Sequence, residues 1–211
     1  MRWFALPACL FLFLSCSATN GDADSAAGLP VVWEVTDGVQ SPESAYFDAG
    51  SGILFVSQIG AGGPTGKDGD GAISKLSPDG TVVAAKWITG LNAPKGMRSF
   101  QGRLWVSDID QLVGIDIEQG EIAERIEVPE AQFLNDVACD DEGAVYVSDM
   151  STGKIHRFQD GKLSVYAEGD QLESPNGLLV DGQRLIVAAW GGKTPGHLLS
   201  LDLATGAKTR I

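Results

Sequence analysis

Cysteine is scarce in this sequence, and its positions exclude a fold held by disulfides. The chain has three cysteines in 211 residues, and Cys9 and Cys16 both lie in the N-terminal segment. Cys139 is the single cysteine of the remaining chain, so no intrachain disulfide can crosslink that part. We expect Cys139 to be a small residue within a strand.

Basic residues are also few, and this excludes one class of partner. The chain carries 15 Lys and Arg residues against 28 Asp and Glu residues, with a formal net charge of −13 at pH 7. Such a surface repels phosphate backbones, so we expect no nucleic-acid partner. The same acidity lowers the free-energy cost of holding a divalent cation.

Helical periodicity is missing from the sequence after the N-terminal segment. Gly or Pro interrupts every window in which apolar residues could repeat at 3.6 residues, which excludes helical solenoids. Glycine is abundant instead, with 27 residues, well above the usual share of about 7%. Many turns between short apolar stretches predict an all-β fold.

The N-terminal segment has the pattern of an export signal. Residues 1–16 contain one charge, Arg2, followed by an apolar run that extends to Leu14. This run is too short to span a bilayer, and small residues follow it. We therefore predict an exported protein whose signal covers residues 1–16.

The end of this signal resembles a lipid-attachment site. Cys16 follows Leu14 and Ser15 as in the lipobox of bacterial lipoproteins, although Phe13 stands where an aliphatic residue is usual. Simple cleavage near Thr19 is the alternative. Residues 17–29 hold little to bury and predict a flexible tether. The expected location is the periplasm, an outer-membrane tether or the medium, with membrane contact only through an N-terminal lipid.

A repeat of roughly forty residues runs through the rest of the chain. Each repeat begins at a Pro or Leu before a short apolar stretch, and these starts cover residues 42–46, 94–98, 134–138 and 175–179. A compact apolar strand follows in each, over residues 53–57, 104–108, 145–149 and 185–189. The first repeat is longer than the others, and its extra residues fall in 59–71.

Two further strands complete each repeat. The third alternates apolar and polar residues, as over 73–76 and 199–203, and leads into a turn containing glycine. The fourth is predicted over residues 81–87, 122–128, 163–166 and 208–211. Four strands per repeat form the blade of a β-propeller, so we predict an all-β propeller over residues 30–211. An open β-sandwich is the alternative.

Residues 31–35 predict one extra strand before the first repeat. In many propellers such a strand completes the last blade and locks the ring. The blade that it would complete is not evident in the sequence. Two interpretations stay open: the four repeats close alone, or they are an incomplete part of a longer ring.

The repeats place four polar residues at equivalent positions. These residues are Glu43, Lys95, Asn135 and Asn176, each just after the start of a first strand. First strands line the channel of a propeller, so the four side chains should converge on one end of its axis. One carboxylate and two amide oxygens suit a divalent cation, most of all Ca²⁺, with Mg²⁺ or Mn²⁺ as alternatives. Turn asparagines and a solvated glutamate are the competing explanation.

The chain resembles the six-bladed propeller family of regucalcin, gluconolactonase and strictosidine-synthase-like proteins, of the calcium-dependent lactonase type. The resemblance covers the whole of residues 30–211. It rests on three motifs, which are Pro42-Glu43-Ser44-Ala45 with Asp48, Phe133-Leu134-Asn135-Asp136, and Ser174-Pro175-Asn176-Gly177-Leu178.

The resemblance implies roles for these residues. Glu43 and Asn176 would be metal ligands, and Asn135 would face the substrate beside the metal. The family's remaining ligand, an Asp in an Asp-Gly motif that also acts as general base, would lie beyond Ile211. Six blades are implied, so this chain would carry about four of them and lack the rest.

Lys95 departs from this pattern. An ammonium group opposes a cation beside it, unless the side chain extends to the rim or pairs with Glu43. Alternatively, Lys95 binds an anionic substrate group or orients a lactone carbonyl. The sequence thus favours a metal-dependent hydrolase acting on a small lactone or related ester. A non-catalytic propeller that binds a ligand or a protein is the alternative.

Overall fold

The computed structural model describes residues 30–169, 171–193 and 195–211. The chain divides into two units, Met1–Val32 and Trp33–Ile211. The predicted signal, the predicted tether and the predicted lipidation site at Cys16 lie outside the described residues. The larger unit contains all the secondary structure described below.

The larger unit consists of sixteen strands. In chain order these are β1 (Pro42–Asp48), β2 (Ile53–Gln58), β3 (Gly71–Leu76), β4 (Val82–Leu91), β5 (Pro94–Phe100), β6 (Arg103–Asp108), β7 (Gln111–Asp116), β8 (Glu121–Glu127), β9 (Leu134–Cys139), β10 (Val145–Asp149), β11 (Lys154–Gln159), β12 (Lys162–Glu168), β13 (Pro175–Asp181), β14 (Arg184–Ala189), β15 (His197–Asp202) and β16 (Lys208–Arg210). The described ranges contain no helix, and therefore no helix that could span a membrane.

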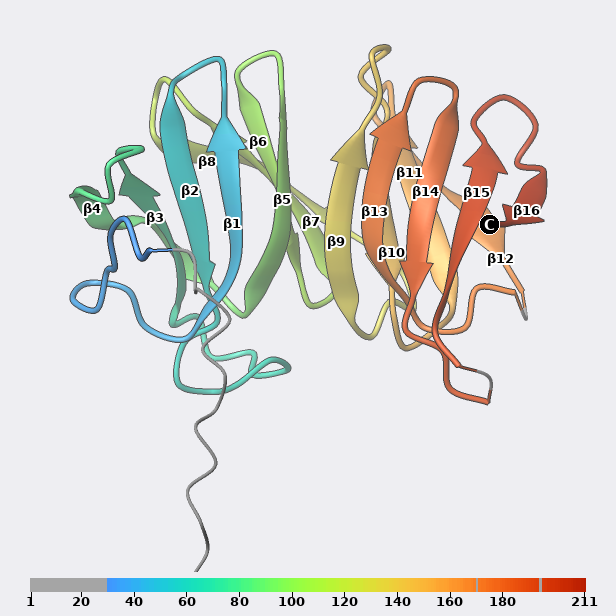
Figure 1. Cartoon of the computed structure of the whole chain (residues 1–211), viewed down its shortest axis with the longest axis horizontal. Coiled ribbons are helices and arrows are strands. Elements are labelled where there is room, and N and C mark those ends of the chain that lie inside the picture. Colours follow the sequence, from blue (N-terminus) through green and yellow to red (C-terminus); the bar gives the residue numbers. More distant parts are fainter. Residues whose placement is uncertain (1–29, 170, 194) are drawn as a thin grey trace, which may run out of the picture. The chain divides into compact units, whose positions relative to one another are not determined.

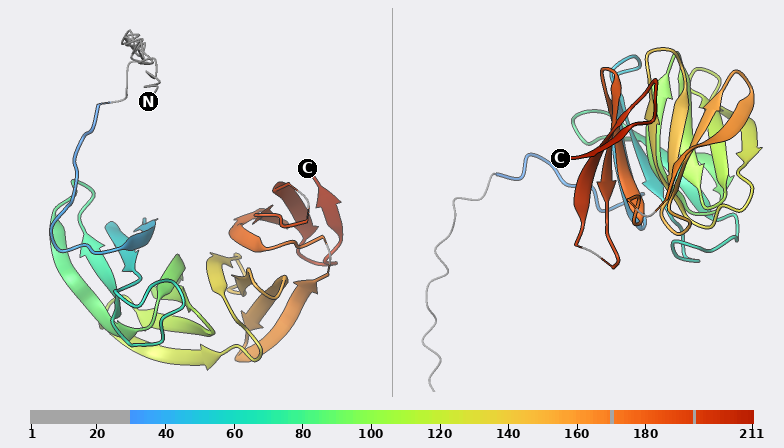
Figure 2. Two further views of the ribbon diagram at one scale, coloured as in Figure 1. Left: turned by 90° about the horizontal axis from the view of Figure 1, so that it is seen from below. Right: turned by 90° about the vertical axis from the view of Figure 1, so that its right-hand side faces the viewer.

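The strands form four antiparallel sheets, each made of four consecutive strands in sequence order. We call them blade 1 (β1–β4), blade 2 (β5–β8), blade 3 (β9–β12) and blade 4 (β13–β16). Within this unit, the blades follow one another along an arc whose inner edge is formed by the first strands (Figures 1 and 2). The fold is that of a β-propeller, as the repeat predicted.

The predicted extra strand over residues 31–35 is wrong. These residues pair with no strand in the structure. The ring of Trp33 instead lies against Gly80 in the turn between β3 and β4, where a Cβ atom would come within 2.7 Å of it. Trp33 is therefore held by side-chain packing and not by strand pairing.

Apolar side chains join each blade to the next. One cluster lies between blades 1 and 2 around Phe55 and Leu104, the second between blades 2 and 3 around Trp105 and Val147. The third lies between blades 3 and 4 and includes Tyr146. Because each cluster takes residues from two blades, no blade buries its apolar faces alone.

Buried aspartates hold the loops that enter the first strands. Asp149, at the end of β10, accepts hydrogen bonds from the backbone N–H groups of Gln132 and Phe133 at 3.0 and 3.1 Å. Asp108, at the end of β6, accepts the N–H groups of Asn92 and Ala93. The Asp that ends the second strand therefore fixes where the first strand of the same blade begins.

Cys139 ends β9 and forms no disulfide. Burial among apolar neighbours raises the pKa of its thiol to about 12. The thiol is thus a packing group at the junction of blades 2 and 3.

Replacing Asp149 with Ala should lower the free energy of unfolding by about 2–4 kcal/mol, because it leaves several amide donors without their acceptor. Asp149 is fully buried and also accepts the N–H groups of Ser151 and Thr152. Urea unfolding followed by circular dichroism measures the change. The exposed Glu121→Ala on β8 is the control and should stay within about 0.5 kcal/mol of the parent protein. Equal stability of the two variants would contradict this role of Asp149.

Candidate functional site

The four predicted polar residues occupy the same place in their blades. Glu43, Lys95, Asn135 and Asn176 are each the second residue of a first strand, in β1, β5, β9 and β13. These strands run in the same direction, so their first residues lie at one end of the blades, the lower end in Figure 1. We call this end the channel end.

Buried serine hydroxyls fix the backbone of the two asparagines. Ser107 Oγ in blade 2 donates to the carbonyl of Asn135 in blade 3 at 2.5 Å. Ser148 Oγ in blade 3 donates to the carbonyl of Asn176 in blade 4 at 2.7 Å, and it accepts the N–H of Asp136 at 3.0 Å. Each asparagine is therefore positioned by the second strand of the preceding blade.

Asp136 is a site residue that the sequence analysis did not assign. Its Oδ2 atom accepts the backbone N–H of Leu178 in blade 4 at 2.7 Å, and Oδ1 accepts that of Val137. Burial raises the pKa of Asp136, and the two amide hydrogen bonds oppose this rise. A Cβ atom on Gly96 of blade 2 would come within 2.3 Å of Oδ1. Asp136 thus touches the blades on both sides of its own.

Glu43 belongs to the same electrostatic cluster. The residue as a whole is exposed, yet the protein around its carboxyl group raises its pKa through burial. The Lys95 charge lowers the pKa of Glu43 in part, and the Asp136 charge adds to the rise. Charges on blades 2 and 3 therefore influence the pKa of the Glu43 carboxyl in blade 1 at the channel end.

Lys95 lies inside the protein and does not extend to the rim. It is 1% exposed, and its Nζ atom donates to the carbonyl of Ala93 at 2.9 Å and lies 4.6 Å from the ring centroid of Phe133. Burial lowers its pKa, whereas Asp108 and Glu43 oppose this shift. No carboxylate of the described residues lies within 4 Å of Nζ, so the ion pair with Glu43, one of the alternatives that the sequence left open, does not form.

The donor atoms at this end fit a hard cation in part. In the described part of the chain, the side chains of Glu43 and Asn135 make no hydrogen bond, and Asn176 uses only Nδ2, which contacts Met150 Sδ at 3.8 Å. Three side chains therefore have oxygens available to a ligand. No group of three or more His, Cys, Asp or Glu suited to a metal occurs among the described residues, so any site here depends on the two amides.

The long loop of blade 1, over residues 59–70, lies at the channel end (Figure 1). Asp70 Oδ2 accepts the N–H of Ala61 at 2.7 Å, and Lys67 Nζ lies 2.6 Å from Asp110 Oδ2 in blade 2. The loop is thus held by a hydrogen bond within the loop and by an ion pair with blade 2.

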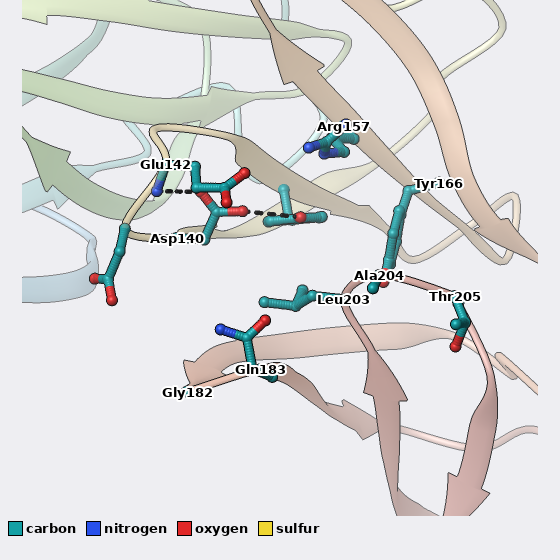
Figure 3. Close-up of a pocket in the computed structure, with 12 residues that line it drawn as sticks. Asp140, Glu142, Arg157, Tyr166, Gly182, Gln183, Leu203, Ala204 and Thr205 are labelled. Carbon is teal, nitrogen blue, oxygen red and sulfur yellow. Dashed lines mark hydrogen bonds between the residues drawn. The ribbon is translucent and has the colours of Figure 1, made fainter.

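A cleft of about 480 Å³ opens between blades 3 and 4 at the opposite end. Figure 3 shows Arg157 and Tyr166 from blade 3 facing Gln183 and Leu203 from blade 4 across it. At its base, the buried Asp140 accepts the hydroxyl of Tyr146 at 3.1 Å. Burial raises the pKa of Tyr146 to about 12, so the hydroxyl stays protonated and donates to Asp140.

The structure is similar to solved β-propeller proteins. A streptogramin B lyase matches with a TM-score of 0.60 at 15% identity, covering 79% of this chain and 53% of the lyase. A chain of a nidogen/laminin complex matches with a TM-score of 0.63 at 20% identity, covering 83% of this chain and 64% of that one. The extracellular domain of a hybrid two component system from B. thetaiotaomicron matches with a TM-score of 0.58 at 16% identity, covering 81% and 24%.

These likenesses establish the fold and no more. This chain spans about half the length of the lyase and less than two thirds of the other two chains. No protein-family model matches the sequence, and a search of curated proteins gives no match.

Replacing Lys95 with Met should raise the pKa of Glu43, because the Lys95 charge is the contribution that lowers it. An NMR pH titration of the Glu43 carboxyl carbon measures this pKa directly. The exposed Lys86→Met on β4 is the control and should leave it unchanged. A pKa of Glu43 that falls or stays constant in Lys95→Met would show that the two groups do not interact.

Proposed function

We propose that the channel end is the site of a metal-dependent hydrolase that opens a small lactone or related ester. The observation that carries this proposal is the presence of available side-chain oxygens at one equivalent position of three blades, on Glu43, Asn135 and Asn176. The resemblance to the calcium-dependent lactonase family supports a catalytic site at this end, and the likeness to a lyase is consistent with a propeller that carries a catalytic function. The identity of the reaction is our proposal for this chain.

The donor set favours calcium. Glu43 would contribute the carboxylate, and Asn135 and Asn176 neutral amide oxygens, all of which are hard ligands. Bound there, the cation would polarise the substrate carbonyl. Asn135 would contact both cation and substrate, because its side chain has no other partner among the described residues.

Lys95 would act on the site from within the protein. Burial raises the pKa of Glu43, and the Lys95 charge opposes this rise. Lys95 therefore favours the ionised carboxylate, which is the form that binds a cation. The residues of this chain would bind and orient the substrate.

We also propose that the protein works outside the cytoplasm. The export pattern of residues 1–16 supports a periplasmic or secreted protein, and Cys16 supports a lipid tether.

The alternative is a binding propeller without catalysis, and the cleft between blades 3 and 4 favours it. This cleft has a size suited to a small ligand, and both aromatic and charged side chains line it. A ligand bound there would lie at the end opposite to Glu43.

Calcium should raise the melting temperature of the protein, because a ligand that binds the folded state alone stabilises it. Glu43→Gln deletes the carboxylate of the set and should remove most of this rise, and Asn176→Leu should do the same. Glu121→Gln, on the outer strand β8, is the matched control and should respond like the parent protein. Differential scanning calorimetry in EDTA and in rising Ca²⁺ measures the effect. An unchanged melting temperature at millimolar Ca²⁺ would refute the metal site.

A panel of aldonolactones provides the test of the reaction. The rate of acid release during lactone hydrolysis, measured with a pH-stat, should depend on Ca²⁺. This rate should fall at least about tenfold in Asn135→Ala, because a ligand of both cation and substrate is lost. Ligand-induced melting shifts that survive Glu43→Gln but vanish in Arg157→Ala would favour the cleft and the binding function instead.

A further inference from the structure

A second cleft lies between blades 1 and 2, and it repeats the construction of the cleft between blades 3 and 4. It has a volume of about 660 Å³, and turns of both blades line it at the end opposite to the channel end. Both clefts have a size suited to small molecules. We call them the Lys75 cleft and the Arg157 cleft, after the basic residue of the third strand that lines each one.

The two basic residues occupy equivalent positions. Each is paired with an aromatic residue of the second strand, and the ring of that residue packs on a ring from the fourth strand. The two sets are Lys75 with Phe55 and Trp87 in blade 1, and Arg157 with Tyr146 and Tyr166 in blade 3. Lys75 Nζ lies 3.9 Å from the ring centroid of Trp87, and Arg157 Cζ lies 5.9 Å from that of Tyr146. Each cation is therefore held over an aromatic ring.

A buried aspartate lies at the same place in both clefts. Asp48 ends β1, and Asp140 follows the last residue of β9. Asp48 accepts the hydroxyl of Ser99 in blade 2 at 2.5 Å, and Asp140 accepts the hydroxyl of Tyr146. Each aspartate also accepts backbone N–H groups of its own turn. The two carboxylates thus hold the turns that form the clefts.

Neither cation has an anionic partner in the described part of the chain. Four other basic residues form ion pairs there, but no carboxylate lies within 4 Å of Lys75 Nζ or of the Arg157 guanidinium. The buried Nε atom of Arg157 has no hydrogen-bond acceptor either. Burial lowers the pKa of Lys75, and an anion bound beside it would oppose this shift. Both clefts therefore present a positive charge that the protein leaves unpaired.

The junction of blades 2 and 3 shows that such a cation is not needed to join two blades. Gly114 stands at the equivalent position, paired with Trp105, and a Cβ atom there would come within 3.0 Å of the Trp105 ring. This ring packs on Phe158 of blade 3 instead, with centroids 5.5 Å apart. Lys75 and Arg157 are thus additions to the common blade packing.

We propose that the two clefts bind small organic monocarboxylates that have an apolar body. The carboxylate would lie on Lys75 or Arg157. The apolar body would lie on Ile117 or Leu203, which the turn between the third and fourth strands of the next blade brings to each cleft. Because both clefts lie at the end opposite to the channel end, this binding does not depend on the proposed hydrolase function.

The charges around the clefts favour a ligand with a single negative charge. Each cleft contains one unpaired cation, and the chain carries a formal net charge of −13. Glu118 also lines the Lys75 cleft, and Asp141 and Glu142 line the Arg157 cleft, although the Glu142 carboxylate points away from Arg157 (Figure 3). A phosphate group, with up to two negative charges, would be repelled more strongly than a carboxylate.

Two-dimensional ¹⁵N–¹H NMR of the protein in EDTA, titrated with sodium benzoate, tests the proposal. Benzoate should shift the amide signals of Ile117 and Leu203, and each signal reports the affinity of its own cleft. Lys75→Met should weaken binding at Ile117 by at least about tenfold and leave Leu203 unchanged, because it removes one cation. Arg157→Met should do the reverse. The exposed Lys86→Met on β4 is the matched control and should bind like the parent protein.

Two analogues of benzoate test the ligand class. Benzamide has the same ring without the charge and should bind at least about tenfold more weakly. Phenyl phosphate should also bind more weakly than benzoate. Equal binding of benzamide, tighter binding of phenyl phosphate, no benzoate shift at Ile117 and Leu203, or shifts that persist in Lys75→Met and Arg157→Met would each overturn the proposal. Circular dichroism melting curves check that the variants are folded, and EDTA keeps the result independent of the proposed metal site.

Discussion

The hydrogen bonds from the second strand of one blade to the first strand of the next are the constraint on which the rest of the structure depends. Ser107 and Ser148 are fully buried, and their hydroxyls donate to backbone carbonyls of the following blade. These carbonyls belong to Asn135 and Asn176, whose side chains form part of the candidate site. A shift of one blade against the next would leave a buried hydroxyl or carbonyl unsatisfied, at a cost of about 1–3 kcal/mol. The packing of the blades and the geometry of the channel end are therefore coupled.

The charged groups at the channel end make this coupling stronger. Lys95 is buried with a backbone carbonyl and an aromatic ring as its near partners, and the Asp136 carboxylate is shared between blades 3 and 4. Charges held in this way are costly unless they compensate one another. Glu43 and Lys95 oppose each other's burial-driven pKa shifts across blades 1 and 2, whereas the Asp136 charge adds to the rise in the pKa of Glu43.

The sequence was sufficient to predict the repeat, the four strands of each blade and the equivalence of Glu43, Lys95, Asn135 and Asn176. The forty-residue repeat and the glycine-containing turns determine these features, and both can be recognised from neighbouring residues in the sequence. The interactions between blades were not predictable in the same way, because a Ser or Asp in a strand gives no sign of which backbone group it will reach. For Lys95 the sequence left open a place at the rim, a pair with Glu43 or a contact with substrate, because its burial beside Phe133 depends on the neighbouring blade. The extra strand expected over residues 31–35 failed because an apolar pattern alone does not decide between strand pairing and side-chain packing, and Trp33 packs against Gly80.

The high pKa of Cys139 has a practical consequence for chemical labelling. At a pKa of about 12, only about one thiol in 10⁴ is a thiolate near pH 8, and the thiolate is the form that reacts with maleimides and iodoacetamides. A cysteine introduced on an exposed turn would therefore react far faster than Cys139, and the native thiol need not be removed first. Single fluorophores or spin labels could be attached to individual blades, and distances between blades could then be followed in solution.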